Sequence, residues 1–138
     1  MNLKNDDKVL NYLGLDWGEK RIGLATGDSD SRLALPFMTV PDLKALIPIL
    51  KEEEIDVIVL GEPIKMRGEA VNNEAWLNFF KKLKEESGLE VLLVDERLSS
   101  LAADALGGDS RQRASRDEIS AAIILQSYLD KIKNSSEA

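Results

Sequence analysis

Residues 12–26, YLGLDWGEKRIGLAT, decide how the fold begins. The apolar run at 12–16 predicts a first β-strand, and residues 21–26 predict a second one. Gly18 lies in the short segment between the two runs, where a glycine is typical of a turn. Two short strands joined by a glycine-containing turn form a β-hairpin, so we expect the chain to open with an antiparallel pair.

The pattern after the hairpin changes from a meander to alternating strands and helices. Residues 33–40 predict a third strand, and Pro36 favours a sheet edge because proline lacks the N–H that a central strand donates. Apolar runs predict two buried strands at 56–60 and 90–94. Helical spacing predicts four helices, at 43–50, 74–87, 99–106 and 117–132. The sequence therefore predicts an α/β fold with a mixed five-stranded sheet, whose first three strands form an antiparallel meander, flanked by helices.

Three of these elements carry details that the structure can test. Asp42 can cap the helix at 43–50, but Pro48 lies within it, so this helix either kinks or begins later. The helix at 74–87 places Trp76, Leu77, Phe80 and Leu83 on one face, and Gly88 ends it. Residues 64–72 and 107–115 are expected to be loops, the second of them rich in glycine, serine and arginine.

Length and composition favour one folded domain. The chain has 138 residues, 43% hydrophobic and 31% charged, which is typical of a globular protein. We expect a single domain over 1–138, with loose termini at 1–8 and 134–138. No apolar run is long enough for a membrane span and no signal peptide is visible, so we expect a cytoplasmic protein.

The absence of two residue types restricts the chemistry. The sequence contains neither cysteine nor histidine. This excludes disulfides, thiolate metal sites, Ser-His-Asp catalysis and most zinc sites. The net charge is −7, which opposes the binding of polyanions by the protein as a whole. Catalysis must therefore rest on oxygen-bearing or basic side chains, with or without a hard cation.

Acidic residues lie at three predicted junctions. Asp16 closes the first strand, Asp95 and Glu96 follow the last strand, and Asp117 opens the last helix. Parallel strands would bring these positions to the carboxyl edge of the sheet, where sites form in α/β proteins. Clustered carboxylates repel one another unless a cation neutralises them. With oxygen ligands only, Mg²⁺ or Mn²⁺ fits such a site, and a pair of these ions can hydrolyse a phosphodiester.

Each of these carboxylates also has a purely structural interpretation. Asp16 can shape the turn that begins at Gly18. Glu96 can be a solvated surface charge. Asp117 can be a helix N-cap or a first-turn acid that complements the helix dipole. Spacing alone does not decide between these interpretations and a metal site.

Basic residues accompany the carboxylates along the chain. Lysine or arginine lies beside Asp16, in the central loop, after Glu96 and before Asp117, at Lys20, Arg21, Lys65, Arg67, Arg97, Arg111, Arg113 and Arg116. These side chains are candidate phosphate contacts for a nucleic acid, although scattered lysine and arginine also serve to solubilise a surface. Aromatic residues make up only 5%, so base stacking is not expected to dominate.

Four ordered motifs resemble one known family. Residues 14–25, GLDWGEKRIGLA, resemble the opening signature of the YqgF family, whose members are bacterial proteins described as pre-16S rRNA processing nucleases and as Holliday junction resolvases. Residues 59–68, 94–99 and 117–129 resemble three further motifs in the same order. The resemblance spans residues 12–130 and implies an RNase H-like fold of the resolvase type. It also implies metal-site roles for Asp16, Glu96 and Asp117.

The sequence departs from the family pattern at a few positions. Trp17, Glu19 and Glu62 stand where smaller or less polar residues are usual, and Lys65 and Arg67 replace common Asn and Asp. These departures affect the expected substrate details, and Glu19 beside Asp16 could alter metal affinity.

Three functional hypotheses remain open at this point. The first is a metal-dependent endonuclease acting on precursor ribosomal RNA or on branched DNA, with homodimerisation possible. The second is a non-catalytic ribosome-assembly or nucleic-acid-binding module. The third is an ATPase, because Asp16-x-Gly18 followed by Gly23 resembles the phosphate loop of actin-like and sugar-kinase folds. Those folds bind nucleotide between two domains, and 138 residues supply one.

Overall fold

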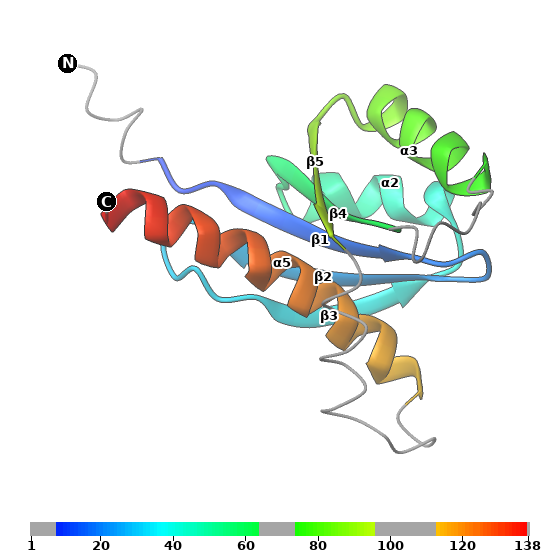
Figure 1. Cartoon of the computed structure of the whole chain (residues 1–138). Helices are drawn as coiled ribbons and strands as arrows, with labels where there is room; N and C mark the ends of the chain where they lie inside the picture. Colours follow the sequence, from blue (N-terminus) through cyan, green and yellow to red (C-terminus); the bar gives the residue numbers. More distant parts are fainter. Residues whose placement is uncertain (1–7, 64–73, 96–112, 138) are drawn as a thin grey trace.

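A five-stranded mixed sheet forms the centre of the molecule in the computed structural model, which describes residues 8–63, 74–95 and 113–137. The strand order is β3-β2-β1-β4-β5 (Figure 1). The strands are β1 (Asn11–Trp17), β2 (Ile22–Asp28), β3 (Leu35–Val40), β4 (Val57–Glu62) and β5 (Glu90–Asp95). β1, β2 and β3 pair antiparallel, and β1, β4 and β5 pair parallel. This arrangement confirms the predicted mixed sheet with its antiparallel meander.

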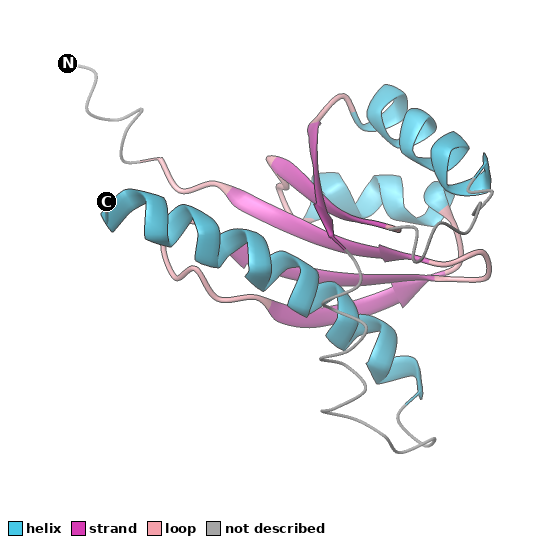
Figure 2. Ribbon diagram, in the orientation of Figure 1, coloured by secondary structure: helices cyan, strands magenta, loops and turns pink. Residues whose placement is uncertain are grey.

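Helices cover both faces of the sheet. α2 (Leu43–Glu52) and α3 (Glu74–Ser87) lie on one face, and the long α5 (Arg113–Glu137) crosses the other (Figure 2). Alternation along β1 separates the two layers of core. Leu13 and Leu15 pack with α2 and α3, whereas Tyr12 packs with α5. No helix in the described part of the chain is long and apolar enough to cross a membrane.

Two glycines let α5 lie unusually close to the sheet. A Cβ atom on Gly14 would lie 2.7 Å from the Leu125 Cβ and 2.8 Å from the Ala121 carbonyl oxygen. A Cβ atom on Gly23 would lie 2.2 Å from the carbonyl oxygen of Asp117. Non-bonded heavy atoms do not approach this closely, so any larger residue at either position would push the helix outward. The two glycines of the opening hairpin therefore determine the distance between α5 and strands β1 and β2.

The first helix begins where its cap predicts. The backbone N–H of Ala45 donates to the Asp42 carboxylate at 2.9 Å, and α2 starts at the next residue, Leu43. The alternative of a later start is wrong, because the helix continues through Pro48. Pro48 cannot donate to the Lys44 carbonyl, but both residues are exposed, so water can replace that bond.

Two predictions about burial need correction. On α3 the buried residues are Trp76, Phe79 and Leu83, while Leu77 is 56% exposed. The buried residues follow the spacing i, i+3 and i+7, and Trp76 also donates its indole N–H to the Gly61 carbonyl at 3.2 Å. Leu77 lies about 100° further around the helix from Trp76 and therefore faces solvent. β5 was expected to be buried, but it is an edge strand with exposed Leu93. Gly88 does end α3, with a positive φ of 67°.

The last helix is longer than predicted at both ends. α5 begins at Arg113, so residues 113–116 are helical and Asp117 does not open the helix. It continues to Glu137 and so includes most of the expected loose tail at 134–138. Arginine and alanine are good helix formers, which favours the early start of α5 at residues 113–116, whereas the flank at 134–137 (Asn-Ser-Ser-Glu) has no comparable local signal. The predicted helix at 99–106 and the loop at 64–72 lie outside the described residues.

We expect the protein to lose stability at high pH because Tyr12 is buried in the core beneath α5. Burial, followed by the neighbouring Tyr128, raises the pKa of its phenol from 10.0 to about 12. As the pH rises, the phenol of Tyr12 ionises in the unfolded chain before it ionises in the folded protein. The contribution of the neutral phenol to the free energy of unfolding is therefore complete below pH 10. It falls by about 2 kcal/mol as the pH rises to 12. Urea unfolding from pH 9 to 12 should show a smaller loss for Tyr12→Phe than for the wild type. Parallel curves for the two proteins would contradict the assignment.

Candidate active site

Asp16 and Asp117 come from opposite ends of the sequence and meet at one end of the sheet. Asp16 lies near the carboxyl end of β1 and pairs with Gly23 of β2. The backbone of Asp117 lies directly over Gly23, where a Cβ would be 3.0 Å from the Asp117 Cβ. Leu15 and Trp17 pack with the α2 and α3 layer, so alternation turns Asp16 toward α5. The close approach at Gly23 thus brings the two carboxylates to one place.

These two carboxylates line a common cleft. Its volume is about 490 Å³, and its walls are residues 16–21 and Asp117. The β1–β2 turn is closed by the backbone N–H of Gly18, which donates to the Arg21 carbonyl at 3.0 Å. The turn places Lys20 and Arg21 beside the acids and includes Glu19 in the wall. The cleft therefore combines acidic and basic groups on a small, open surface.

One ion pair crosses this cleft. The Arg21 Nε donates to the Asp117 Oδ2, and the two side chains are 45% and 26% exposed. The pair joins residues 96 apart in the sequence. Asp117 therefore has a tertiary partner, and the N-cap interpretation of this residue is wrong because it lies inside α5.

The orientation of residues at the end of β5 bears on the choice between the two acids that follow this strand in the sequence, Asp95 and Glu96. Val94 packs in the core beneath α5. Alternation then turns Asp95, opposite Glu62, toward the other face of the sheet, away from Asp16 and Asp117. Asp95 is thus poorly placed to join them. Glu96, the preferred residue at sequence level, lies outside the described residues.

The donors in the cleft suit a hard cation, although the described residues do not complete a site. No group of three potential metal ligands occurs among residues 8–63, 74–95 and 113–137. Two carboxylates from separate elements do converge, and carboxylate oxygens are the ligands that Mg²⁺ and Mn²⁺ prefer. β5 is parallel to β1 and β4, so its carboxyl end at Asp95 lies at the same end of the sheet as Asp16.

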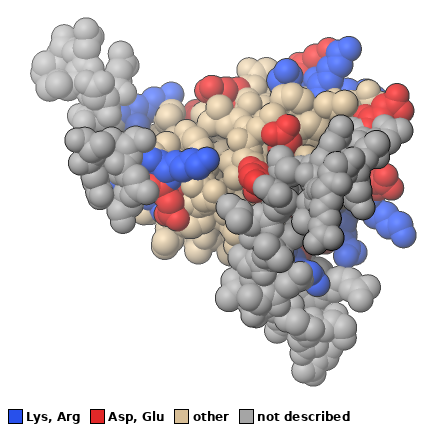
Figure 3. Space-filling view, in the orientation of Figure 1, with Lys and Arg blue, Asp and Glu red and all other residues tan. Residues whose placement is uncertain are grey.

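The structure brings some of the predicted basic residues together and leaves others undescribed. Lys20 and Arg21 line the cleft, and the exposed Arg116 precedes Asp117 on α5. Arg113 begins α5, but its side chain is outside the described part. The remaining candidates, Lys65, Arg67, Arg97 and Arg111, are also outside it. Acidic and basic side chains intermingle on the visible part of the face in Figure 3, without one continuous basic surface.

Sequence reasoning missed the role of Gly23. The residue is recognisable afterwards from its place on β2, opposite Asp16, because only glycine allows α5 to approach there. Trp17 lines the cleft and packs against Phe79 with ring centroids 5.9 Å apart. Trp17 therefore joins the cleft wall to the core.

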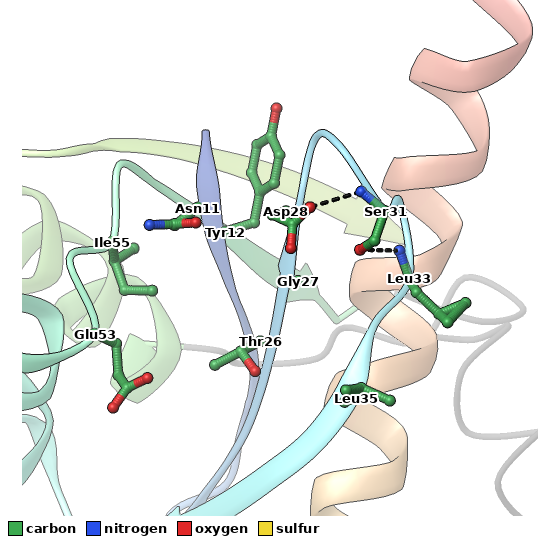
Figure 4. A pocket seen from close by; sticks show the side chains of 10 residues that line it. All are labelled: Asn11, Tyr12, Thr26, Gly27, Asp28, Ser31, Leu33, Leu35, Glu53 and Ile55. Atoms are coloured by element: carbon green, nitrogen blue, oxygen red, sulfur yellow. Dashed lines mark hydrogen bonds between the residues drawn. The ribbon is translucent and has the colours of Figure 1, made fainter. Parts of the chain in front are cut away.

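A second cavity, of about 360 Å³, lies at the opposite end of β1 and β2 (Figure 4). Its carboxylates are Asp28 and Glu53. Asp28 already accepts from the backbone N–H groups of Asp30 and Ser31, at 2.9 and 2.7 Å, and so closes a turn. This cavity lacks the convergence of acidic and basic groups that marks the cleft at Asp16.

Comparisons with known proteins find relatives over most of the chain. Residues 10–131 match the family model described as "RuvX: Holliday junction resolvase". A relative from Caldanaerobacter subterraneus subsp. tengcongensis, named "Putative pre-16S rRNA nuclease", is 37% identical over 91% of this chain and all of its own length. Relatives with the same name from Geobacillus kaustophilus and Anaplasma marginale are 39% and 40% identical, over 86% and 88% of this chain and 96% and 85% of their own.

Solved structures support the fold. RuvC of T. thermophilus in complex with a Holliday junction substrate superposes with a TM-score of 0.57 at 14% identity, covering 91% of this chain and 96% of that one. The fowlpox virus Holliday junction resolvase gives 0.53 at 17% identity, covering 88% and 99%. The sheet and its helices thus have the RNase H-like architecture of the resolvases.

Proposed function

This chain belongs to the RuvX family of Holliday junction resolvases, the YqgF family of the sequence resemblance, and we propose that it cuts structured nucleic acid as a metal-dependent endonuclease. The family is one of nucleases, so the reaction is hydrolysis of a phosphodiester. One observation carries the proposal for this chain: Asp16 and Asp117 converge on a cleft that also contains Lys20 and Arg21. Acids for a cation and bases for phosphate are the two requirements of such a site.

Asp16 and Asp117, with Glu96 as the third acid, are the proposed ligands and catalytic residues. When Mg²⁺ or Mn²⁺ is bound, it supplies an activated water and neutralises charge at the phosphate. In the proposed site, these carboxylates would hold the cation at the carboxyl end of β1. The anchoring of Asp117 over Gly23 fixes the distance between two of them.

The basic side chains of the cleft are the proposed nucleic-acid contacts. Lys20 and Arg21 offer donors to the phosphates beside the scissile bond, and Arg116 extends this surface along α5. Lys65, Arg67, Arg97, Arg111 and Arg113 complete the proposed set. A net charge of −7 opposes binding elsewhere on the protein, so these local contacts select where the polyanion lies.

The proposed substrate is precursor 16S rRNA, cut near its 5′ end during ribosome biogenesis. The names of relatives that are 37–40% identical over most of the chain support this choice. Branched DNA is the second candidate, because the description of the family model favours it. Both would be held mainly by backbone contacts and shape. We also propose a cytoplasmic location, and a homodimer would suit a substrate that is cut on two strands.

Cleavage of matched substrates tests this proposal. A precursor-16S 5′ fragment and a four-way DNA junction should be incubated with the protein in Mg²⁺, in Mn²⁺ and in EDTA. We expect cleavage of the RNA with either metal, and removal of the metal by EDTA should abolish it, since the carboxylates alone repel phosphate. Preferential cleavage of the junction would make branched DNA the substrate.

A variant lacking all three acids separates catalysis from binding. Asp16→Asn, Glu96→Gln and Asp117→Asn combined should bind the RNA in a filter or anisotropy assay but yield no product. Equal product from this variant would identify a contaminating nuclease. Binding without cleavage by the wild type, in every metal, would favour the non-catalytic module. Tight ATP binding measured by calorimetry would instead favour the ATPase hypothesis.

A further inference from the structure

Arg21 is placed where it can compete with a metal ion. Its guanidinium donates to Asp117, one of the two described acids of the cleft. Its backbone is held by the turn, because its carbonyl accepts from the Gly18 N–H at 3.0 Å and β2 begins at the next residue. The backbone of Arg21 is thereby anchored, while 45% of its side chain is exposed to solvent.

A divalent cation on Asp117 would oppose this ion pair in two ways. The cation needs carboxylate oxygen as a ligand, and Arg21 already occupies the Oδ2 of Asp117. A bound cation also places like charge beside the guanidinium, which raises the electrostatic energy of the pair. Lys20 lines the same cleft and carries the same charge as Arg21. Within the described part of the chain, however, Asp117 forms its ion pair with Arg21 and not with Lys20.

We propose that Arg21 is a metal-displaced positioning residue: it neutralises Asp117 in the metal-free protein, and a bound cation releases its guanidinium to a nucleic-acid phosphate. This inference rests on the proposed function and adds to it a coupling between metal binding and nucleic-acid binding. Arginine suits both states, because its planar fork matches carboxylate and phosphate alike. Metal binding and nucleic-acid binding then favour each other, as reciprocal linkage requires.

Metal affinity without nucleic acid is the first test. Mn²⁺ binding should be titrated by electron paramagnetic resonance for the wild type, Arg21→Ala and Lys20→Ala. Both variants remove one positive charge, but only Arg21→Ala removes the competitor. We expect Arg21→Ala to bind Mn²⁺ about threefold more tightly than Lys20→Ala, because an exposed ion pair contributes modestly. Arg21→Lys should lie nearer to the wild type. A damaged fold would weaken binding, so a gain in affinity is specific to the release of Asp117.

Salt dependence of RNA binding is the second test. It should be measured with Ca²⁺, after checking that no product forms, and in EDTA. Each phosphate contact adds about 1 to the slope of log affinity against log salt. Arg21→Ala should lower this slope by about 1 with Ca²⁺ and leave it unchanged in EDTA, whereas Lys20→Ala should lower it in both.

The possible failures can be told apart. Equal or weaker Mn²⁺ binding by Arg21→Ala than by Lys20→Ala overturns the competition, even if the enzyme cleaves RNA normally. A slope lowered equally in Ca²⁺ and EDTA overturns the release to phosphate. Absence of Mn²⁺ binding by the wild type overturns the metal dependence in the proposed function and this coupling with it.

Discussion

Replacing Asp16 with asparagine is expected to lower the cleavage rate by more than about 100-fold. Loss of a residue that merely orients a metal ligand costs 10–100-fold, and loss of a ligand should cost at least as much. The asparagine has the same shape, so β1 and its pairing with β2 should persist. Single-turnover cleavage of the precursor-16S fragment in Mg²⁺ measures the effect.

A matched control is available in the turn that follows the hairpin. Asp30→Asn makes the same chemical change at an exposed position in the turn after β2, outside the cleft. Its cleavage rate should stay within about twofold of the wild type, since surface substitutions have small effects. Thermal unfolding should show that both variants are folded. A rate for Asp16→Asn within tenfold of the wild type would remove this residue from the catalytic set.

Gly23→Ala is expected to destabilise the protein by about 3 kcal/mol and to weaken Mn²⁺ binding at the same time. The added methyl would lie 2.2 Å from the Asp117 carbonyl oxygen and 2.5 Å from its carbonyl carbon. Both atoms belong to the backbone, so relief requires α5 to move, and overpacking of this kind costs about 1–3 kcal/mol or more. Movement of α5 carries Asp117 away from Asp16. Urea unfolding and Mn²⁺ titration measure the two effects.

Gly88→Ala separates the loss of stability from the loss of the site. Gly88 has open space around its Cβ position but a φ of 67°, so alanine is strained there without a clash. We expect a cost of about 1 kcal/mol and an unchanged Mn²⁺ affinity, because Gly88 follows α3 far from the cleft. Unaltered metal affinity in Gly23→Ala would show that the close approach of α5 does not position Asp117.

Local patterns predicted most of the sheet, since each strand carries its own signal. The hairpin at 12–26, the proline-bearing edge strand and the two parallel runs all lie where the sequence placed them. The predictions that failed depend on tertiary partners. Leu77 lies at the margin of the apolar face of α3, and the packing of Trp76 and Phe79 into the core leaves it exposed. The start of α5 at Arg113 has no sharp local signal, because the residues before Asp117 favour a helix as readily as a loop.

Of the candidate site, the sequence could predict only which residues lie at the ends of strands. Parallel pairing of β1, β4 and β5 confirms that Asp16 lies at the shared carboxyl end. The meeting of Asp117 with Arg21 could not be predicted, since it depends on how α5 is packed over two glycines. The metal role of Asp16, Glu96 and Asp117 stays a prediction.

The origin of the two acids in distant parts of the chain has a consequence during protein synthesis. Asp16 lies on β1 and Asp117 on α5, and all five strands of the sheet precede α5. A growing chain that has reached only the end of β5 therefore contains Asp16 but not Asp117. Until the ribosome has delivered the last helix, the cleft lacks one of its walls. The proposed pair of acids is therefore complete only after α5 has been synthesised.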